Sequence, residues 1–101
     1  MIIIPAFANS TNVEELTIRD ANGQPVDFAA IGAVSARIFA GGDFVDCSLG
    51  IDGKLSFVPG DLQISTMDHP AVLRIYSAGD TKGKVCAGPG LPTSISVRMV
   101  A

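Results

Sequence analysis

Apolar and polar residues alternate with a period of two over much of this 101-residue chain. In the segment 94–99, for example, three apolar side chains alternate with two serines and an arginine. Such alternation is typical of strands that bury one face and expose the other. The pattern predicts strands at 16–19, 34–39, 54–58, 71–76 and 94–99.

Pairs of turn-forming residues separate these strands. Asp52-Gly53 is the strongest hairpin signal, because a type I′ turn needs a positive φ at both central positions. Asn22-Gly23 predicts a second turn, and Pro25 restricts the residues after it to an edge or to a strand start. No segment carries a convincing helical stripe with caps. We therefore predict an all-β fold, a small antiparallel β-sandwich (immunoglobulin-like or jelly-roll-like) with about seven or eight short strands.

The size and composition of the chain indicate one ordered domain. Hydrophobic residues make up 48% and charged residues 17%, which argues against disorder. We expect residues 1–12 to form an apolar N-terminal arm or edge strand, because "MIIIPAF" suits strand pairing, and residues 13–101 to form a single β-sandwich domain. The first residues do not match a secretory signal peptide, since no positive charge precedes the apolar run and Pro5 interrupts it.

The charge of the chain and the length of its apolar stretches argue against two classes of partner. The net charge is −3, and no run of Lys or Arg offers a surface for phosphate backbones, so we expect no nucleic-acid partner. The longest apolar stretches are far shorter than the roughly 20 residues of a membrane helix, so we expect no membrane partner.

Candidate catalytic and metal-binding residues are sparse. The single histidine, His69, precedes a predicted strand and is expected to be a solvated loop residue, because Asp68 beside it points to the opposite side of an extended chain. Cys47 and Cys86 are expected to be buried thiols, and a disulfide between them stays open as an alternative. Three aspartates within 43–52 miss the calcium-loop pattern, although a weak calcium site stays open as an alternative. We predict no catalytic residues, no metal site and no cofactor, hence no enzyme.

The chain's four arginines all fall on the non-core face of predicted strands, whereas its three lysines fall at turns or strand starts. The planar guanidinium group suits interfaces and paired carboxylates. Cross-strand pairing with acids explains the arginines without a partner, so both interpretations stay open. As an interface hypothesis we take the N-terminal apolar residues together with the arginines: Ile2, Ile3, Ile4, Phe7, Arg19, Arg37, Arg74 and Arg98.

The segment 16–28, "LTIRDANGQPVDF", followed by small residues and an alternating strand, resembles the opening of immunoglobulin-like domains in tailed-phage virion proteins. It is most similar to the N-terminal domain of phage baseplate upper proteins, with a D-x-x-G-x-P-V-D-hydrophobic motif. "GKLSF" followed by Pro59-Gly60 is similar to the mid-domain hairpin of that family. The resemblance implies a sandwich fold and a place in the virion, assembled in the host cytoplasm.

Two functions follow as hypotheses. The first is a non-enzymatic phage virion protein of the tail, baseplate or capsid surface, which contacts other copies of itself or other virion proteins. The second is a soluble module that binds carbohydrate or another small ligand. The absence of Trp and the presence of a single tyrosine, Tyr76, weigh against the second, since sugar sites often use aromatic platforms.

Overall fold

The computed structural model of the chain describes residues 2–20, 22–88 and 93–101. It is almost entirely β-structure, which confirms the all-β prediction. The elements are β1 (Ile2–Phe7), β2 (Glu14–Thr17), β3 (Ala33–Ala40), β4 (Asp43–Leu49), β5 (Lys54–Phe57), the short 3-10 helix η1 (Pro59–Asp61), β6 (Asp68–Ser77), β7 (Asp80–Ala87) and β8 (Ile95–Val100).

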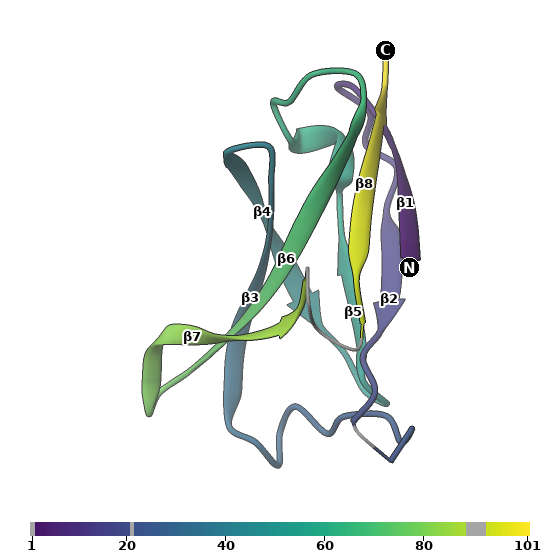
Figure 1. The fold of residues 1–101 in the computed structure, drawn as a ribbon. Helices are drawn as coiled ribbons and strands as arrows, with labels where there is room; N and C mark the ends of the chain where they lie inside the picture. The colour runs from purple at the N-terminus through teal and green to yellow at the C-terminus, as the bar shows by residue number, and fades with distance from the viewer. Residues whose placement is uncertain (1, 21, 89–92) are drawn as a thin grey trace.

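The eight strands form one nearly closed sheet with the order β1-β8-β6-β3-β4-β5-β2, and β7 pairs with β6 beside this path (Figure 1). The number of strands agrees with the predicted seven or eight. β4 pairs with β3 on one side and with β5 on the other, and so joins the two layers of the fold. The arrangement is that of a small all-β domain, as expected for a sandwich.

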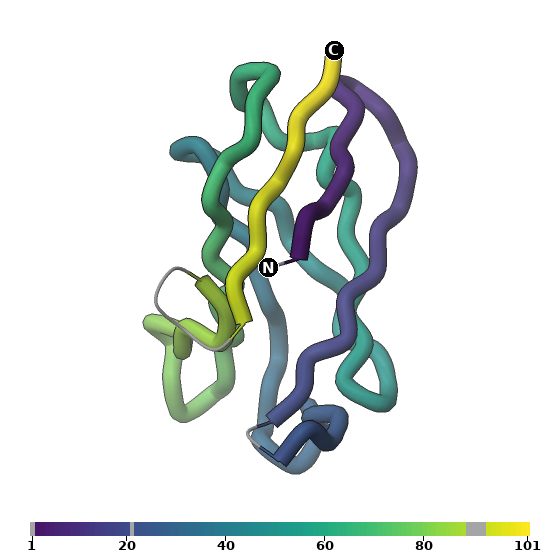
Figure 2. Tube along the Cα trace, turned by 45° about the vertical axis from the view of Figure 1, so that its right-hand side comes forward, coloured from purple at the N-terminus to yellow at the C-terminus, as the bar shows by residue number. Residues whose placement is uncertain are grey.

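One pairing departs from the antiparallel prediction: β1 runs parallel to β8, with Ile2 opposite Ile95 and Phe7 opposite Val100. Figures 1 and 2 both show the two strands side by side. A two-residue turn forces its strands to be antiparallel, whereas β1 and β8 are joined only through the rest of the chain. No local sequence signal therefore fixes their relative direction.

β1 is an edge strand that also contributes to the core. Ile4 and Ala6 are buried, so β1 is integral to the fold rather than a free arm. The backbone N–H groups of Ile2 and Ala8 donate to β8 and its flanking residue Ser94. Because successive residues turn their N–H groups to opposite edges, the nitrogen of Pro5 faces the edge that β8 does not occupy, where a proline costs no ladder hydrogen bond.

The core follows the predicted alternation. Ile38 on β3, Leu73 on β6 and Val97 on β8 are fully enclosed between the layers. Leu55 on β5 closes the core from the other layer. Burial of such side chains is the main stabilising term of a domain this size.

Both predicted turns are confirmed. Asp52 and Gly53 have φ values of 55° and 72°, and the N–H of Lys54 donates to the carbonyl of Ile51, as a type I′ hairpin requires. In the turn before Pro25, one carboxylate oxygen of Asp20 accepts the backbone N–H groups of Asn22 and Gln24.

Two strands went unpredicted, β4 and β7. The sequence of β7, "DTKGKVCA", is polar and contains a glycine, and its positions do not alternate clearly between buried and exposed. It forms a strand because β6 extends beyond β8 and leaves an edge for β7 to pair with. The prediction that all lysines lie at turns or strand starts is therefore wrong, since Lys82 and Lys84 lie within β7.

Candidate functional site

The outer face of the sheet carries a row of charged side chains that crosses three strands. Asp46 on β4 lies opposite Arg37 on β3, and Arg37 lies opposite Arg74 on β6. Aromatic side chains occupy neighbouring positions on the same three strands. We call this set the arginine–aromatic face, and its members are Arg37, Phe39, Phe44, Asp46, Arg74 and Tyr76.

Arg37 lies at the centre of this face. Its Nε donates to Oδ1 of Asp46 at 2.9 Å, and both side chains stay partly exposed. The guanidinium carbon lies 4.5 Å from the centre of the Phe44 ring and 5.7 Å from that of Tyr76. One ion pair and two cation–π contacts therefore hold Arg37 against the sheet.

Arg74 is held differently. Its guanidinium carbon lies 5.8 Å from the Phe39 ring centre, and its Nη1 donates to the backbone carbonyl of Lys82 at 3.2 Å. The Nε atom is buried without an acceptor among the described residues, and no salt bridge to Arg74 occurs there. Arg74 thus brings a charge that no carboxylate within the described chain neutralises.

Gly83 on β7 makes room for these side chains. Its φ is +82°, and a Cβ at this position would lie 2.5 Å from Cγ of Arg74 and 2.7 Å from Cε1 of Tyr76. The aliphatic stem of Arg74 and the ring of Tyr76 therefore lie over the bare backbone of β7. A glycine at this site is a steric requirement of the face.

The alternation of the sequence placed Arg37 and Arg74 on the outer face, whereas the aromatic members of the face were not predicted. Phe39 and Phe44 pack with ring centres 5.6 Å apart at the turn end of β3 and β4. Phe39 lies two positions after Arg37 on β3, and Tyr76 lies two positions after Arg74 on β6. The alternation could therefore have placed both rings on the outer face beside the arginines. Phe44 and Asp46 could not be placed, because β4 was not predicted.

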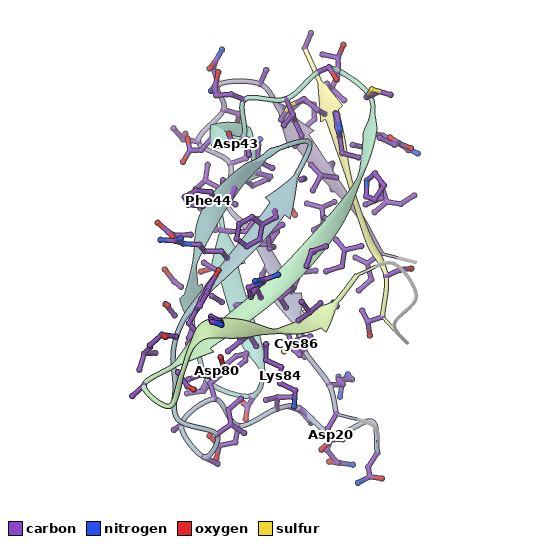
Figure 3. All side chains as sticks on the ribbon, turned by 60° about the vertical axis from the view of Figure 1, so that its left-hand side comes forward. Asp20, Asp43, Phe44, Asp80, Lys84 and Cys86 are labelled. Atoms are coloured by element: carbon purple, nitrogen blue, oxygen red, sulfur yellow. The ribbon has the colours of Figure 1, made fainter. Side chains whose placement is uncertain are left out.

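Two shallow hollows flank the face. One, of about 410 Å³, lies against β4 and β5 and is lined by Phe44, Asp46, Ser56 and Asp61 among others. The other, of about 270 Å³, is lined by Arg37, Tyr76 and Val34 together with neighbouring polar residues. Figure 3 shows Phe44 beside Asp43 at the start of β4, whereas Asp80, Lys84 and Cys86 lie along β7 toward the other end of the molecule.

A second group of the predicted interface residues gathers where β1 meets β8. Ile3 and Phe7 are each 46% exposed, and Val100 opposite Phe7 is 41% exposed. Arg98 on β8 lies opposite Pro5 and donates from Nε and Nη2 to the two carboxylate oxygens of Asp68, at 2.8 and 3.0 Å. These hydrogen bonds hold the pKa of Asp68 below its usual value.

The remaining predicted interface residues lie elsewhere. Ile4 is 3% exposed and belongs to the core, so it presents no surface to a partner. Ile2 is 38% exposed at the start of β1. Arg19 lies beside the Asn22-Gly23 turn, where its Nη1 donates to the carbonyl of Gly23 at 3.1 Å, and it is not part of either group.

His69 is not the solvated loop residue that the sequence suggested. It lies within β6, is half-buried, and its Nε2 lies 2.8 Å from the backbone carbonyl oxygen of Ser65. β6 begins at Asp68, earlier than the predicted strand at 71–76, so His69 falls within the strand and its ring contacts the preceding loop. Asp43, from the acidic segment, accepts the backbone N–H of Gln63 at 2.7 Å, which lowers its pKa.

Both cysteines are free thiols, as predicted. Burial raises the pKa of Cys47 to about 12, and burial also raises the pKa of Cys86. Since the thiolate is the nucleophile, neither cysteine is activated at neutral pH.

No group of three or more His, Cys, Asp or Glu side chains is arranged to hold a metal ion within 2–20, 22–88 and 93–101. The same residues contain no helix with the length and apolar character needed to span a membrane. No family model, no curated protein and no solved structure matches this chain.

Proposed function

We propose that the chain is a non-enzymatic structural protein of a phage particle, of the tail, baseplate or capsid surface, that assembles through contacts between copies of itself and with other virion proteins. The observation that carries this proposal is the amphipathic outer face of the sheet. Partly exposed aromatic side chains surround Arg37 and Arg74 there, and exposed side chains of β1 and β8 lie beside Arg98. Aromatic residues and Arg are enriched in protein interfaces, and such residues supply most of their binding energy.

The strand order supports an immunoglobulin-like sandwich, the fold implied by the resemblance to phage virion domains. The order β8-β6-β3-β4 corresponds to strands G, F, C and C′ of variable-type immunoglobulin domains, and the pair β2–β5 corresponds to B and E.

The contacts would form through side chains rather than by adding a strand at β1. Strand addition needs backbone donors along the free edge, and Pro5 places a residue without an N–H there. Ile3 and Phe7, which are exposed at the same edge, would instead pack against a neighbour.

A size measurement tests this proposal. Removing residues 1–7 would also remove the core residues Ile4 and Ala6, so point substitutions are the sharper probe. The chain, the variant Ile3→Asp/Phe7→Asp and the control Ile51→Asp would be compared by light scattering over a concentration series. Ile51 is 80% exposed at the β4–β5 turn, away from the outer face. We expect a defined oligomer that only the double variant weakens. A chain that stays monomeric at every concentration overturns the proposal.

A small-ligand module is the second candidate, since the hollow beside β4 combines an aromatic ring with the two carboxylates of Asp46 and Asp61. Arg37 already covers one face of the Phe44 ring, which leaves less of it for a sugar to stack on. Titration with mono- and disaccharides, followed by NMR shifts of Phe44 and Ser56, separates this candidate from the first.

A further inference from the structure

The charged side chains of this protein are segregated between the two parts of the fold. The part made of β3 and residues 68–101 carries five basic and two acidic residues, whereas the rest of the chain carries two basic and eight acidic residues. The net charge of −3 therefore conceals a part with a positive balance and a part with a negative balance, which we call the basic side and the acidic side. Asp46, counted with the acidic side, lies on the arginine–aromatic face, where it pairs with Arg37.

We propose that the arginine–aromatic face of one copy binds the acidic side of a second copy, in a head-to-tail contact; this inference rests on the proposed function. The occupant of the face is a carboxylate of the neighbouring copy, placed between Arg37 and Arg74.

The basic side has an unfilled position for such a carboxylate. Arg37 and Arg74 lie directly opposite each other, and the only carboxylate paired with either within the described chain is Asp46, on the far side of Arg37. The backbone carbonyl of Lys82 on β7 accepts a hydrogen bond from Nη1 of Arg74, and Val85 lies opposite Arg74 in the same row. A carboxylate of the neighbouring copy would form charge-assisted hydrogen bonds with the guanidinium group of Arg74.

The acidic side has carboxylates that no internal contact occupies. Asp20, Asp27 and Asp43 accept backbone N–H groups and so hold turns in place. Asp46 pairs with Arg37. The carboxylates of the remaining four make no hydrogen bond or salt bridge with the described residues, and most of these four residues are exposed. These four are Glu14 and Glu15 on β2, Asp52 in the β4–β5 turn, and Asp61 in η1.

The two surfaces are different parts of the same molecule. Glu15 points away from the core on β2, because Leu16 beside it is buried, and β4 and β5 separate β2 from β3 in the strand order. The contact is therefore heterologous, and each copy keeps one basic and one acidic surface for further neighbours. Such contacts generate closed rings or open filaments rather than simple dimers.

The test uses charge-reversed variants of the full chain. Arg74→Glu reverses the charge at the centre of the basic side. Glu15→Lys/Asp61→Lys reverses two exposed charges of the acidic side whose side chains make no internal bonds. Arg74→Gln repeats the first test with a milder change, in case Arg74→Glu impairs folding. Lys54→Glu is the matched control, since it makes the same charge change on the acidic side. Circular dichroism confirms that each variant is folded.

Sedimentation velocity would be measured over a concentration series at low and high salt. We expect the unmodified chain to associate and to dissociate as salt rises, because these contacts are partly exposed and screened. Each basic-side or acidic-side variant alone should weaken association by about tenfold or more, whereas Lys54→Glu should not. An equimolar mixture of Arg74→Glu with Glu15→Lys/Asp61→Lys should associate more strongly than either variant alone, because it brings an intact basic side together with an intact acidic side.

Two other results would overturn the inference. If the unmodified chain associates but the charge variants and salt leave its association unchanged, this contact is wrong while assembly between copies stands. If the unmodified chain is monomeric at every concentration, both this contact and the proposed self-assembly fail.

Discussion

Arg37 on β3 and Arg74 on β6 lie directly opposite each other, so two like charges share one cross-strand position of the sheet. Like charges in this arrangement destabilise a sheet, and Asp46 on the far side of Arg37 offsets the repulsion. We predict that Asp46→Asn lowers the free energy of unfolding by about 0.5–1 kcal/mol, as for an exposed ion pair. The loss should be greater at low salt, and smaller in an Arg74→Gln background. Urea unfolding of the single and double variants at two salt concentrations checks this, and a loss independent of both salt and Arg74 would contradict it.

Gly83 supports the arginine–aromatic face from β7. We predict that Gly83→Ala lowers the free energy of unfolding by at least about 1–2 kcal/mol, because alanine is strained at a positive φ, and because its Cβ would displace Arg74 and Tyr76. Gly79→Ala is the control, since an added Cβ there meets no atom within 4 Å. Tyr76 is the single tyrosine of a chain without tryptophan, so tyrosine fluorescence reports on this face. An unchanged emission in Gly83→Ala would contradict the packing described.

Gly53 and Gly23 separate the cost of backbone strain from that of steric overlap. Their φ values are close, at +72° and +78°, but a Cβ on Gly53 would lie 2.4 Å from the carbonyl oxygen of Ile18, whereas one on Gly23 meets nothing within 4 Å. We predict a loss of about 1 kcal/mol for Gly23→Ala, from strain alone, and a clearly larger loss for Gly53→Ala. Chemical denaturation of the two variants checks the difference, and equal losses would show that the β4–β5 turn can move away from Ile18.

The pair Asp68–Arg98 predicts a dependence of stability on pH. Because the pKa of Asp68 is lower in the folded chain than its usual value of 3.8, the pair stabilises the fold above that pH, and its contribution is lost as the pH falls through the folded pKa. We predict that the difference in stability between the unmodified chain and Asp68→Asn is constant near neutral pH and shrinks in acid. Asp61→Asn is the control, since the Asp61 carboxylate makes no hydrogen bond or salt bridge with the described residues. Urea unfolding from neutral pH into acid measures the difference, and a gap that persists in acid would contradict the prediction.

The two thiols should differ in accessibility. With its pKa raised to about 12 and its side chain buried, Cys47 should react with a thiol reagent only when the chain unfolds. Cys86 is only half-buried and should react faster, although still more slowly than in the unfolded chain. The single-thiol variants Cys86→Ser and Cys47→Ser, labelled with and without urea, measure each rate. Equal native rates would show that β4 opens locally.

The alternation of apolar residues sufficed to predict the strands with a clear inward side, such as β6 and β8, because burial on one face imposes that pattern locally. It failed for β7, whose pairing depends on the unoccupied edge of β6 rather than on its own side chains. It also selected Ile4 as a surface residue, because a run of four apolar residues does not show which of them the sheet turns inward. Arg37 and Arg74 were selected correctly as outward-facing, but their opposition depends on strand register, which no local pattern encodes.

The parallel ladder between β1 and β8 has a consequence for the order of events in folding. During synthesis, β1 emerges well before β8 and has no ladder partner among the described strands until β8 follows, so this pairing of strands far apart in the sequence forms late. Throughout that interval Ile4 and Ala6 are uncovered, and the strand is free to pair with other nascent chains. Pro5 interrupts the backbone donors of the waiting strand, and thereby protects it kinetically at the stage when it is most prone to aggregate.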